Sequence, residues 1–385
     1  MAQLSDIYTL TNMRIGILSL NPGHNYGGIL QSYALQTILE TLGHNVTIIC
    51  KDPYEKEVGL LSSYKYISRI IRMIKHNSSW EQTVTPELSR NKSRKNICKY
   101  NDEFMKRYLR RKFYSKFSEV KSDSFDCIIV GSDQVWRQKY FEEQYKEDIE
   151  NAFLSFAKDW DIKRYSYAAS FGISELEYND TTIINCGNLL KLFDQVSVRE
   201  KKGIEICLNH FGVNATEVLD PTMLLNAEDY MHRLKINSYP KSKGNMMVYL
   251  LDINDQILNS IKKLNESLDA VPFFVGINNG SNSIDGIFYH PIEQWIRGFF
   301  DADIILTDSF HACVFSILFK KQFLIICNKD RGTSRFDTLL EKFEINDRYL
   351  NIENPIPPSK RIDYQIVSKL IKQEKIKSIN FLKSL

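Results

Sequence analysis

Residues 13–50 read MRIGILSLNPGHNYGGILQSYALQTILETLGHNVTIIC, which combines a strand, a loop, a helix and a second strand. Met13–Leu20 is a short apolar run, and the polar, glycine-containing loop 21–28 follows it. Gly43 ends the helical pattern and precedes the β-branched run 46–50. The helical spacing is carried by Leu30, Ala34, Ile38 and Leu42. Such a unit predicts a parallel sheet, because parallel neighbours need a crossover connection.

The same alternation continues along the chain. After a break in composition at Lys241–Asn245 it begins again. Single cores stop growing near about 250–300 residues, so a chain of 385 residues favours two domains. We expect an α/β fold with two Rossmann-like, doubly wound domains, over 1–225 and 226–385, and a ligand at the carboxyl ends of both sheets. The expected later strands are 127–130, 165–169, 196–198, 218–219, 246–251, 273–275, 304–306 and 323–326.

Charge is distributed unevenly, although the net charge is only +3. Residues 63–121 contain 16 Lys/Arg against five Asp/Glu, and residues 359–385 contain seven against two. We expect a basic helical insertion over the first segment and a basic C-terminal helix over the second. Tyr64–Lys75 has the pattern of an amphipathic basic helix. Such a helix either lies on the surface of an anionic membrane or packs its apolar face on the protein's own core. No nucleic-acid recognition module accompanies these charges, so we expect no nucleic acid.

The sequence also limits the location of the protein. No run of 18 apolar residues is present, and no basic residue precedes Arg14 as a secretory signal would require. The seven cysteines form no C-x-x-C pair and several lie in apolar runs, as is typical of thiols in a reducing compartment. We expect a cytoplasmic protein, at most peripherally attached to the inner face of a membrane.

Several strand ends in the first half carry residues suited to a binding site. Asn25-Tyr26-Gly27 precedes a helix N-terminus, where backbone N–H groups attract anions, or forms a plain tight turn. Gly131-Ser132-Asp133 follows a buried strand, so Asp133 is a candidate base or an N-cap. Ser170 and Arg199 end two later strands; an arginine fork suits carboxylate or phosphate, unless it pairs with Glu200.

The second half contains a denser cluster of such residues. Asp303–Phe319 (DIILTDSFHACVFSILF) predicts a strand, then Thr307-Asp308-Ser309, and a helix that begins near His311. Histidine exchanges protons near neutrality, so His311 is a candidate for proton transfer or a structural histidine. Gly332-Thr333-Ser334-Arg335 precedes the next helix and offers a second anion-binding arginine. With no H-E-x-x-H motif and no Cys/His cluster, we expect no metal.

Taken in order, these motifs resemble the polysaccharide pyruvyl transferase family over residues 13 to about 345. The resemblance implies a two-domain architecture similar to that of glycosyltransferases of the B type. Some branches of the family have an arginine two residues before the histidine, where this chain has Ser309, so Arg335 is expected to supply the second cation. The matching stretches are Asn25-Tyr26-Gly27, Leu30-Gln31, Ala34-Leu35-Gln36, Gly131–Trp136, Ser170-Phe171-Gly172, Val198-Arg199-Glu200, Leu219-Asp220-Pro221, Thr307–His311, Phe315-Ser316 and Gly332–Arg335.

The resemblance further implies transfer of pyruvate from phosphoenolpyruvate, as a co-substrate without any cofactor, onto two hydroxyls of one sugar. The product would be a cyclic ketal on a capsular polysaccharide or exopolysaccharide, and the acceptor a galactose-type residue. The basic segments suit docking at the inner membrane face, where sugars linked to polyprenyl diphosphate lie, and the sequence leaves open a lipid-linked acceptor or a finished polymer. The residues expected to be catalytic are His311, Asp133 and Arg199. The expected donor contacts are Arg199, Ser309, His311, Ser334 and Arg335. The expected acceptor contacts are Asn25, Tyr26, Gly27, Ser132, Asp133 and Ser170.

Two other functions fit the same sequence. A nucleotide-sugar glycosyltransferase of the B type could use the same fold, because a fold does not determine the chemistry. A non-catalytic carbohydrate- or membrane-binding protein is the second alternative, and it predicts that cleft residues have been lost. Phosphate release from phosphoenolpyruvate, rather than release of a nucleoside diphosphate, distinguishes the expected reaction from the first alternative.

Overall fold

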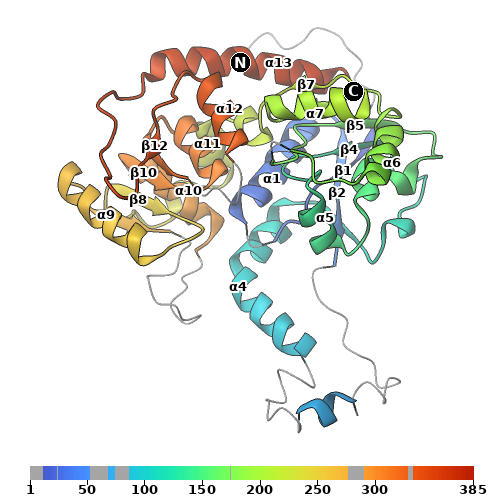
Figure 1. The fold of residues 1–385 in the computed structure, drawn as a ribbon, viewed down its shortest axis with the longest axis horizontal. Helices are drawn as coiled ribbons and strands as arrows, with labels where there is room; N and C mark the ends of the chain where they lie inside the picture. The colour runs from blue at the N-terminus through green and yellow to red at the C-terminus, as the bar shows by residue number, and fades with distance from the viewer. Residues whose placement is uncertain are drawn as a thin grey trace.

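In a computed structural model of the chain, two parallel sheets lie side by side, each with helices on its faces (Figure 1). The structure describes residues 12–23, 25–52, 68–73, 86–173, 175–275, 290–327 and 333–385, and only the backbone of 86–90. Gly332 and most of the expected helix 64–75 lie outside these residues, although 68–73 is helical. The α/β class with two doubly wound sheets, predicted from the sequence, is confirmed.

The first sheet is built from the amino-terminal part of the chain, and its strand order is β3-β2-β1-β4-β5. All its strand pairs are parallel. A small sheet of β6 and β7 continues it through a parallel bridge between Ala169 and Val198. The strands are β1 (Arg14–Leu18), β2 (Asn45–Lys51), β3 (Arg111–Tyr114), β4 (Cys127–Val130), β5 (Lys163–Ser166), β6 (Ser197–Val198) and β7 (Thr216–Glu217). The helices are α1 (Tyr26–Thr41), α4 (Pro86–Tyr108), α5 (Gln138–Tyr145), α6 (Asp180–Leu190) and α7 (Lys201–Phe211), with short 3₁₀ turns η1 (Phe117–Glu119), η2 (Ile149–Phe153), η3 (Ser155–Ala157) and η4 (Pro221–Leu224).

The second sheet has the order β12-β11-β10-β8-β9, again with parallel pairs. Its central strands β8 and β10 are apolar and almost wholly buried. The strands are β8 (Met246–Tyr249), β9 (Pro272–Phe274), β10 (Ile304–Thr307), β11 (Gln322–Ile326) and β12 (Tyr349–Leu350). The helices are α8 (Ala227–Arg233), α9 (Asp255–Leu268), α10 (Ile292–Asp301), α11 (Phe310–Leu318), α12 (Ser334–Lys342) and α13 (Tyr364–Lys383), with the turn η5 (Ile236–Ser238).

The predicted strands correspond closely to the observed ones, with three differences. The strand expected at 218–219 is instead β7, Thr216–Glu217, so that expectation was wrong by two residues. The sequence analysis did not predict β3 and β12. Both are outermost strands, and β3 (RKFY) is polar and partly exposed, so it lacks the apolar run that identifies buried strands.

The two halves are joined by a shared hydrophobic cluster and by the last helix. One cluster includes Ile15 and Leu30 of the first half together with Ile305 and Phe315 of the second. α13 lies along the top of both sheets in Figure 1. Its Ser378 hydroxyl accepts a hydrogen bond from the Leu219 backbone N–H, at 2.9 Å. The large sheets fall on either side of the expected boundary at 225/226, but α13 contacts both halves, so this division stays a prediction.

The two basic segments lie far apart. α4, within the basic insertion, extends away from the body at the bottom of Figure 1, whereas α13 lies at the opposite side. Within the residues that the structure describes, no helix is both long enough and apolar enough to cross a bilayer.

Candidate functional site

A cavity of about 530 Å³ lies between the carboxyl ends of the two sheets. In the first sheet, the chain leaves β1 in one direction and returns at β4 on its other side, so β1 and β4 flank the switch point. β8 and β10 flank the corresponding point of the second sheet. The loops after all four of these strands line the cavity, with Asn21, Asp133, Leu251 and Asp308 among their residues. Ligands of open α/β sheets bind at such switch points.

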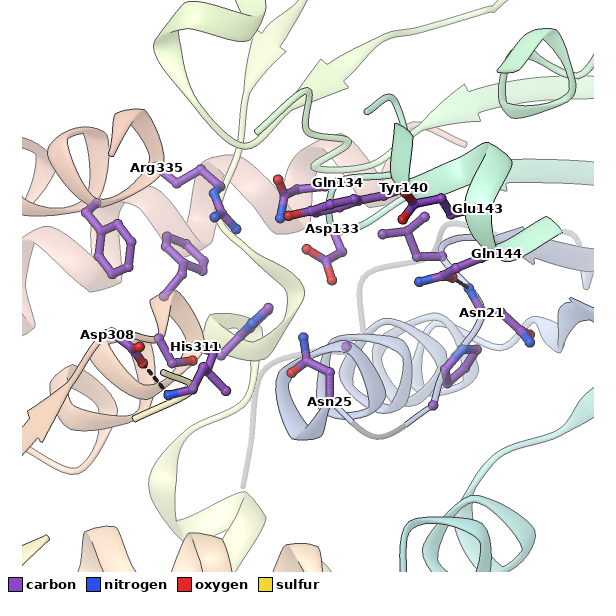
Figure 2. A pocket seen from close by; sticks show the side chains of 18 of the residues that line it. Asn21, Asn25, Asp133, Gln134, Tyr140, Glu143, Gln144, Asp308, His311 and Arg335 are labelled. Carbon is purple, nitrogen blue, oxygen red and sulfur yellow. Dashed lines mark hydrogen bonds between the residues drawn. The ribbon is translucent and has the colours of Figure 1, made fainter. Parts of the chain in front are cut away.

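The second half supplies a wall suited to anions, hereafter the donor wall, formed by Ser309, His311 and Arg335 (Figure 2). α11 begins directly after Ser309 and α12 after Thr333, and in the described structure neither residue's side chain caps its helix. Backbone N–H groups at such a helix start attract negative charge. Burial and, second to it, the nearby charge of Arg199 lower the pKa of Arg335 to about 10, so the guanidinium remains charged at neutral pH.

His311 is wedged between the two halves of the molecule. A Cβ atom added to Gly27, in the first turn of α1, would lie 2.1 Å from Nδ1 of His311. Glycine at position 27 is therefore required for the imidazole to occupy this place. On its other edge, Nε2 of His311 lies 3.5 Å from Oδ2 of Asp220. The imidazole orientation is thus determined by one residue from α1 and one from the loop before η4.

Arg199 lies behind the cavity in a cluster of carboxylates, the buried cluster of Arg199, Asp133, Glu200 and Asp220. Its Nη1 donates to Asp220 Oδ2 at 2.7 Å, its Nη2 to Asp133 Oδ1 at 3.4 Å, and its Nε lies 4.0 Å from Glu200 Oε2. Burial would lower the pKa of Arg199, but the three carboxylates raise it above the usual value. Arg199 does not line the cavity. The expectation that it binds the donor directly stays a prediction.

Asp133 links the buried cluster to the cavity, which it lines. Burial by itself would raise the pKa of this carboxyl, but the charges of Arg199, His311 and Arg335 hold it below its usual value. The carboxylate is therefore ionised at neutral pH and correspondingly weak as a base. The same charges act on Asp220: burial opposes ionisation, but His311 and Arg199 hold its pKa well below the usual value.

The structure brings five of the expected site residues together around the cavity. Asn25, Asp133, Ser309, His311 and Arg335 all line it. In Figure 2, Asn25 and Asp133 project from the first half toward the space that His311 and Arg335 face from the second. Residues separated by as many as 310 positions therefore meet at one site, as the strand-end argument predicted.

Other expected residues hold the protein together rather than lining the cavity. The Tyr26 hydroxyl donates to the His290 carbonyl at 2.7 Å, and the Tyr26 ring packs on Trp295. The Ser132 hydroxyl donates to the Ala168 carbonyl at 3.1 Å. These side chains are buried and have partners within the protein, and their expected contacts with the acceptor stay predictions.

Ser170 and Ser334 also lie outside the cavity lining. The buried Ser170 hydroxyl donates to Oε1 of Glu200 at 2.8 Å, which ties it to the buried cluster. Ser334 is the first residue of α12, and its hydroxyl is buried. Ser170 therefore supports the buried cluster, and the expected substrate contacts of Ser170 and Ser334 stay predictions.

The sequence analysis missed several residues of the site. Asp220 was quoted only as part of a motif and Glu200 as the alternative partner of Arg199, and both contact Arg199 in the structure. The sequence offered one signal for Asp220, because an aspartate directly before Pro221 is typical of a helical N-cap at a strand end. Arg94 lies in the basic segment 63–121, but nothing in the sequence placed it at the cavity, and no signal marked Tyr140, Glu143 or Gln144.

The family model for polysaccharide pyruvyl transferases matches residues 25–330 of the chain. The match includes Asn25, Asp133, Arg199 and His311, and it covers well over half of the sequence. The chain therefore belongs to the polysaccharide pyruvyl transferase family. Among curated proteins, no match is found. The family assignment thus rests on the family model and not on any single characterised relative.

The solved structures similar to the chain include a glycotransferase and an epimerase. The glycotransferase of kitacinnamycin is 11% identical, with a TM-score of 0.49 over 97% of this chain and 99% of that one. The UDP-GlcNAc 2-epimerase from Methanocaldococcus jannaschii is 14% identical, with a TM-score of 0.46 over 94% and 92%. At such identities the similarity concerns the fold alone. In the part of the chain that the structure describes, no group of three or more His, Cys, Asp or Glu side chains is placed to hold a metal ion.

Proposed function

We propose that the protein transfers pyruvate from phosphoenolpyruvate onto two hydroxyls of one sugar, forming a cyclic ketal during synthesis of a capsular polysaccharide or exopolysaccharide. One observation carries the proposal most directly. The cavity joins an anion-binding wall with a histidine, His311, to a second wall that holds the ionised carboxylate of Asp133. This arrangement provides for a phosphorylated donor on one side and a hydroxyl-bearing acceptor on the other, without a resident cofactor.

Phosphoenolpyruvate suits the donor wall because it carries a carboxylate and a phosphate on one small carbon frame. Arg335 provides a planar fork that can bind either group with two parallel hydrogen bonds. The N-termini of α11 and α12 provide backbone N–H donors for the other group. The buried guanidinium of Arg335 needs no large rearrangement to meet this ligand, so its charge acts at full strength in a cavity of limited size.

The reaction can be written with balanced atoms and charges. His311 gives a proton to the methylene carbon of phosphoenolpyruvate, which becomes the methyl group and leaves an oxocarbenium-like centre at the neighbouring carbon. One acceptor hydroxyl forms a C–O bond to that centre and loses its proton. The C–O bond to phosphate then breaks, and the second hydroxyl closes the ketal. Of the two hydroxyl protons, one leaves with the phosphate as hydrogen phosphate, and the other restores His311.

The geometry changes the roles expected for Asp133 and Arg199. Asp133, with its lowered pKa, is better suited to orient the attacking hydroxyl by accepting its hydrogen bond than to remove the proton outright. Arg199 acts through its partners: it holds Asp133 and Asp220, and Asp220 in turn lies against His311. We therefore treat Arg199 as a positioning residue rather than a catalytic one.

For the acceptor we propose a galactose-type residue that can be linked to polyprenyl diphosphate at the inner face of the membrane. Support comes from α4, whose residues 90–99 include Arg90, Lys92, Arg94, Lys95 and Lys99. Arg94 also lines the cavity, so this basic helix continues into the site. A diphosphate near α4 and an anionic lipid surface beyond it would both be attracted. α13, on the opposite side of the molecule, is left out of this proposal.

The function is tested by incubating the protein with phosphoenolpyruvate and a panel of free and lipid-linked galactosides, glucosides and mannosides. Phosphate release and a mass gain of the sugar that equals pyruvate minus water are expected for at least one acceptor. The control replaces phosphoenolpyruvate with UDP-sugars. Release of a nucleoside diphosphate would establish the glycosyltransferase alternative, and sugar binding without any turnover would establish the non-catalytic one.

A further inference from the structure

The cavity has a second wall, hereafter the α5 wall, that the donor chemistry leaves unused. Tyr140, Glu143 and Gln144 of α5 line it, next to Gln134 and Asn21. In Figure 2 these side chains lie on the side of the cavity away from Asp308 and His311, with Asp133 between the two groups. A ligand on this wall would thus lie across Asp133 from the donor wall.

A cation–π contact with Arg137 holds the Tyr140 ring in place. The guanidinium carbon of Arg137, the N-cap residue before α5, lies 4.4 Å from the centre of this ring. Arg137 is itself buried and donates to Oε1 of Gln134 at 3.4 Å. Tyr140 is therefore an aromatic platform with little freedom to lose when a ligand binds, which favours affinity. The face of a sugar ring that carries C–H groups is apolar, and such a face packs well on an aromatic ring.

The polar groups of the α5 wall match a neutral polyol. Oε1 of Gln144 accepts a hydrogen bond from the Asn21 backbone N–H at 2.8 Å, which orients this amide. Asn21 is in turn fixed by its side-chain N–H, which donates to the Lys51 carbonyl at 2.9 Å. Glu143 is exposed and offers two carboxylate oxygens as acceptors. Planar amides and carboxylates beside an aromatic ring can bond adjacent sugar hydroxyls in pairs.

Charge determines which substrate belongs on which wall. Glu143 and Asp133 repel a donor with several negative charges, whereas they accept hydrogen bonds from hydroxyl groups. Arg335 and the N-termini of α11 and α12 attract negative charge, so they favour the donor on the donor wall. The two walls are therefore complementary to different substrates, and Asp133 lies where the substrates would meet.

We propose that α5 forms the acceptor-sugar subsite, in which Tyr140 is the stacking platform and Glu143 and Gln144 are the hydrogen-bonding residues that determine which sugar is accepted. This inference rests on the proposed function, because that function supplies the need for a sugar acceptor. It assigns the acceptor to a helix that none of the motifs in the sequence singled out.

The test uses the full chain and the variants Tyr140→Ala and Glu143→Gln. Glu142→Gln is the matched control, because Glu142 lies on the same helix, accepts from Gln138 at 2.9 Å and does not line the cavity. Binding of methyl β-galactoside, methyl β-glucoside and methyl α-mannoside is followed by saturation-transfer NMR. Binding of phosphoenolpyruvate is followed by calorimetry, and thermal unfolding verifies that each variant is folded.

We expect at least one methyl glycoside to bind the unchanged protein, and each α5 variant to weaken that binding by about tenfold or more, as loss of a stacking or paired hydrogen-bond contact does. Phosphoenolpyruvate binding should stay the same in all variants. Unchanged sugar binding in both α5 variants, no binding by any of the three glycosides, or a loss confined to phosphoenolpyruvate would each overturn the subsite. Should phosphoenolpyruvate fail to bind while sugar binding depends on Tyr140, the proposed reaction is wrong and the subsite stands.

Discussion

Two buried arginines flank the Phe310 ring, one in the buried cluster and one in the donor wall. The guanidinium carbon of Arg199 lies 4.5 Å from the ring centre and that of Arg335 lies 5.7 Å from it. Their surroundings differ: Arg199 contacts three carboxylates, which raise its pKa. For Arg335, burial and the charge of Arg199 lower the pKa to about 10.

This difference separates an arginine whose charge is offset by three carboxylates from an arginine that lines the cavity. The protein has already neutralised Arg199, so its removal would leave buried carboxylates without their cation. Arg335 lines the cavity, and an anion bound there would relieve the cost of its burial. The two arginines are similarly buried and share an aromatic neighbour, but they are expected to differ in effect. Stability should depend on Arg199, and donor affinity should depend on Arg335.

The largest effect is expected from His311→Ala in the donor wall. Turnover with saturating phosphoenolpyruvate should fall by about 10²–10⁴-fold, because a positioned general acid contributes that much. Phosphate release measures it, and His232→Ala, an exposed histidine on α8, is the control. Turnover close to that of the unchanged protein would show that the proton comes from another group.

Arg199→Gln is expected to lower the free energy of unfolding by about 3–5 kcal/mol, since it leaves buried carboxylates unpaired. Urea unfolding measures this loss. Arg335→Gln is the comparison. This variant should lose much less free energy of unfolding, because burial and the charge of Arg199 make the charged guanidinium of Arg335 unfavourable in the folded state. Equal losses in both variants would remove the distinction between the two arginines.

Gly27→Ala tests how closely the two halves must fit. The added Cβ would lie 2.1 Å from Nδ1 of His311, so the imidazole must move. A displacement on the order of 1 Å can reduce turnover by about 10²-fold. At Gly28, the neighbouring position, an added Cβ would lie at an ordinary 3.6 Å from Asp133 Oδ2. Gly28→Ala should therefore reduce turnover far less, and equal losses would refute the contact between Gly27 and His311.

Arg335→Lys keeps the charge and removes the planar fork. The affinity for phosphoenolpyruvate should fall by about tenfold or somewhat more, in line with one charge-assisted hydrogen bond. Calorimetry of donor binding measures the change, and thermal unfolding shows that the fold is kept. Unchanged affinity would mean that the donor does not use a paired contact with Arg335.

The smallest expected effect concerns acid stability. The folded-state pKa values of Asp133 and Asp220 are lowered, so their contribution to stability is present above the usual carboxyl pKa of about 3.9 and is lost as the pH falls through the folded values. The free energy of unfolding should therefore decline as the pH falls below about 4. Urea unfolding at several pH values should show a shallower decline in Arg199→Gln. Parallel curves for the two proteins would contradict this origin of the acid sensitivity.

Much of the site could be predicted because it depends on where strands end. Asp133 lies in the loop after β4, and Ser309 and His311 follow β10. Parallel strands place their carboxyl ends at one edge of the sheet. Residues at these ends therefore lie close together, whatever the length of the sequence between the strands. The cluster around Arg199 could not be predicted, because its partners Asp133 and Asp220 come from separate loops, and only packing decides which carboxylates reach it.

The sequence by itself determined the α/β class, the two sheets and the strand-end residues of the site, because periodicity and the motifs are local properties of the chain. Only the tertiary structure decided that Arg199 is neutralised while Arg335 faces the cavity, that α5 presents Tyr140 to the same space, and that the basic helices α4 and α13 lie on opposite sides. Each of these depends on how distant segments pack together. No spacing along the chain encodes that packing, since it arises from burial and charge pairing across the whole fold.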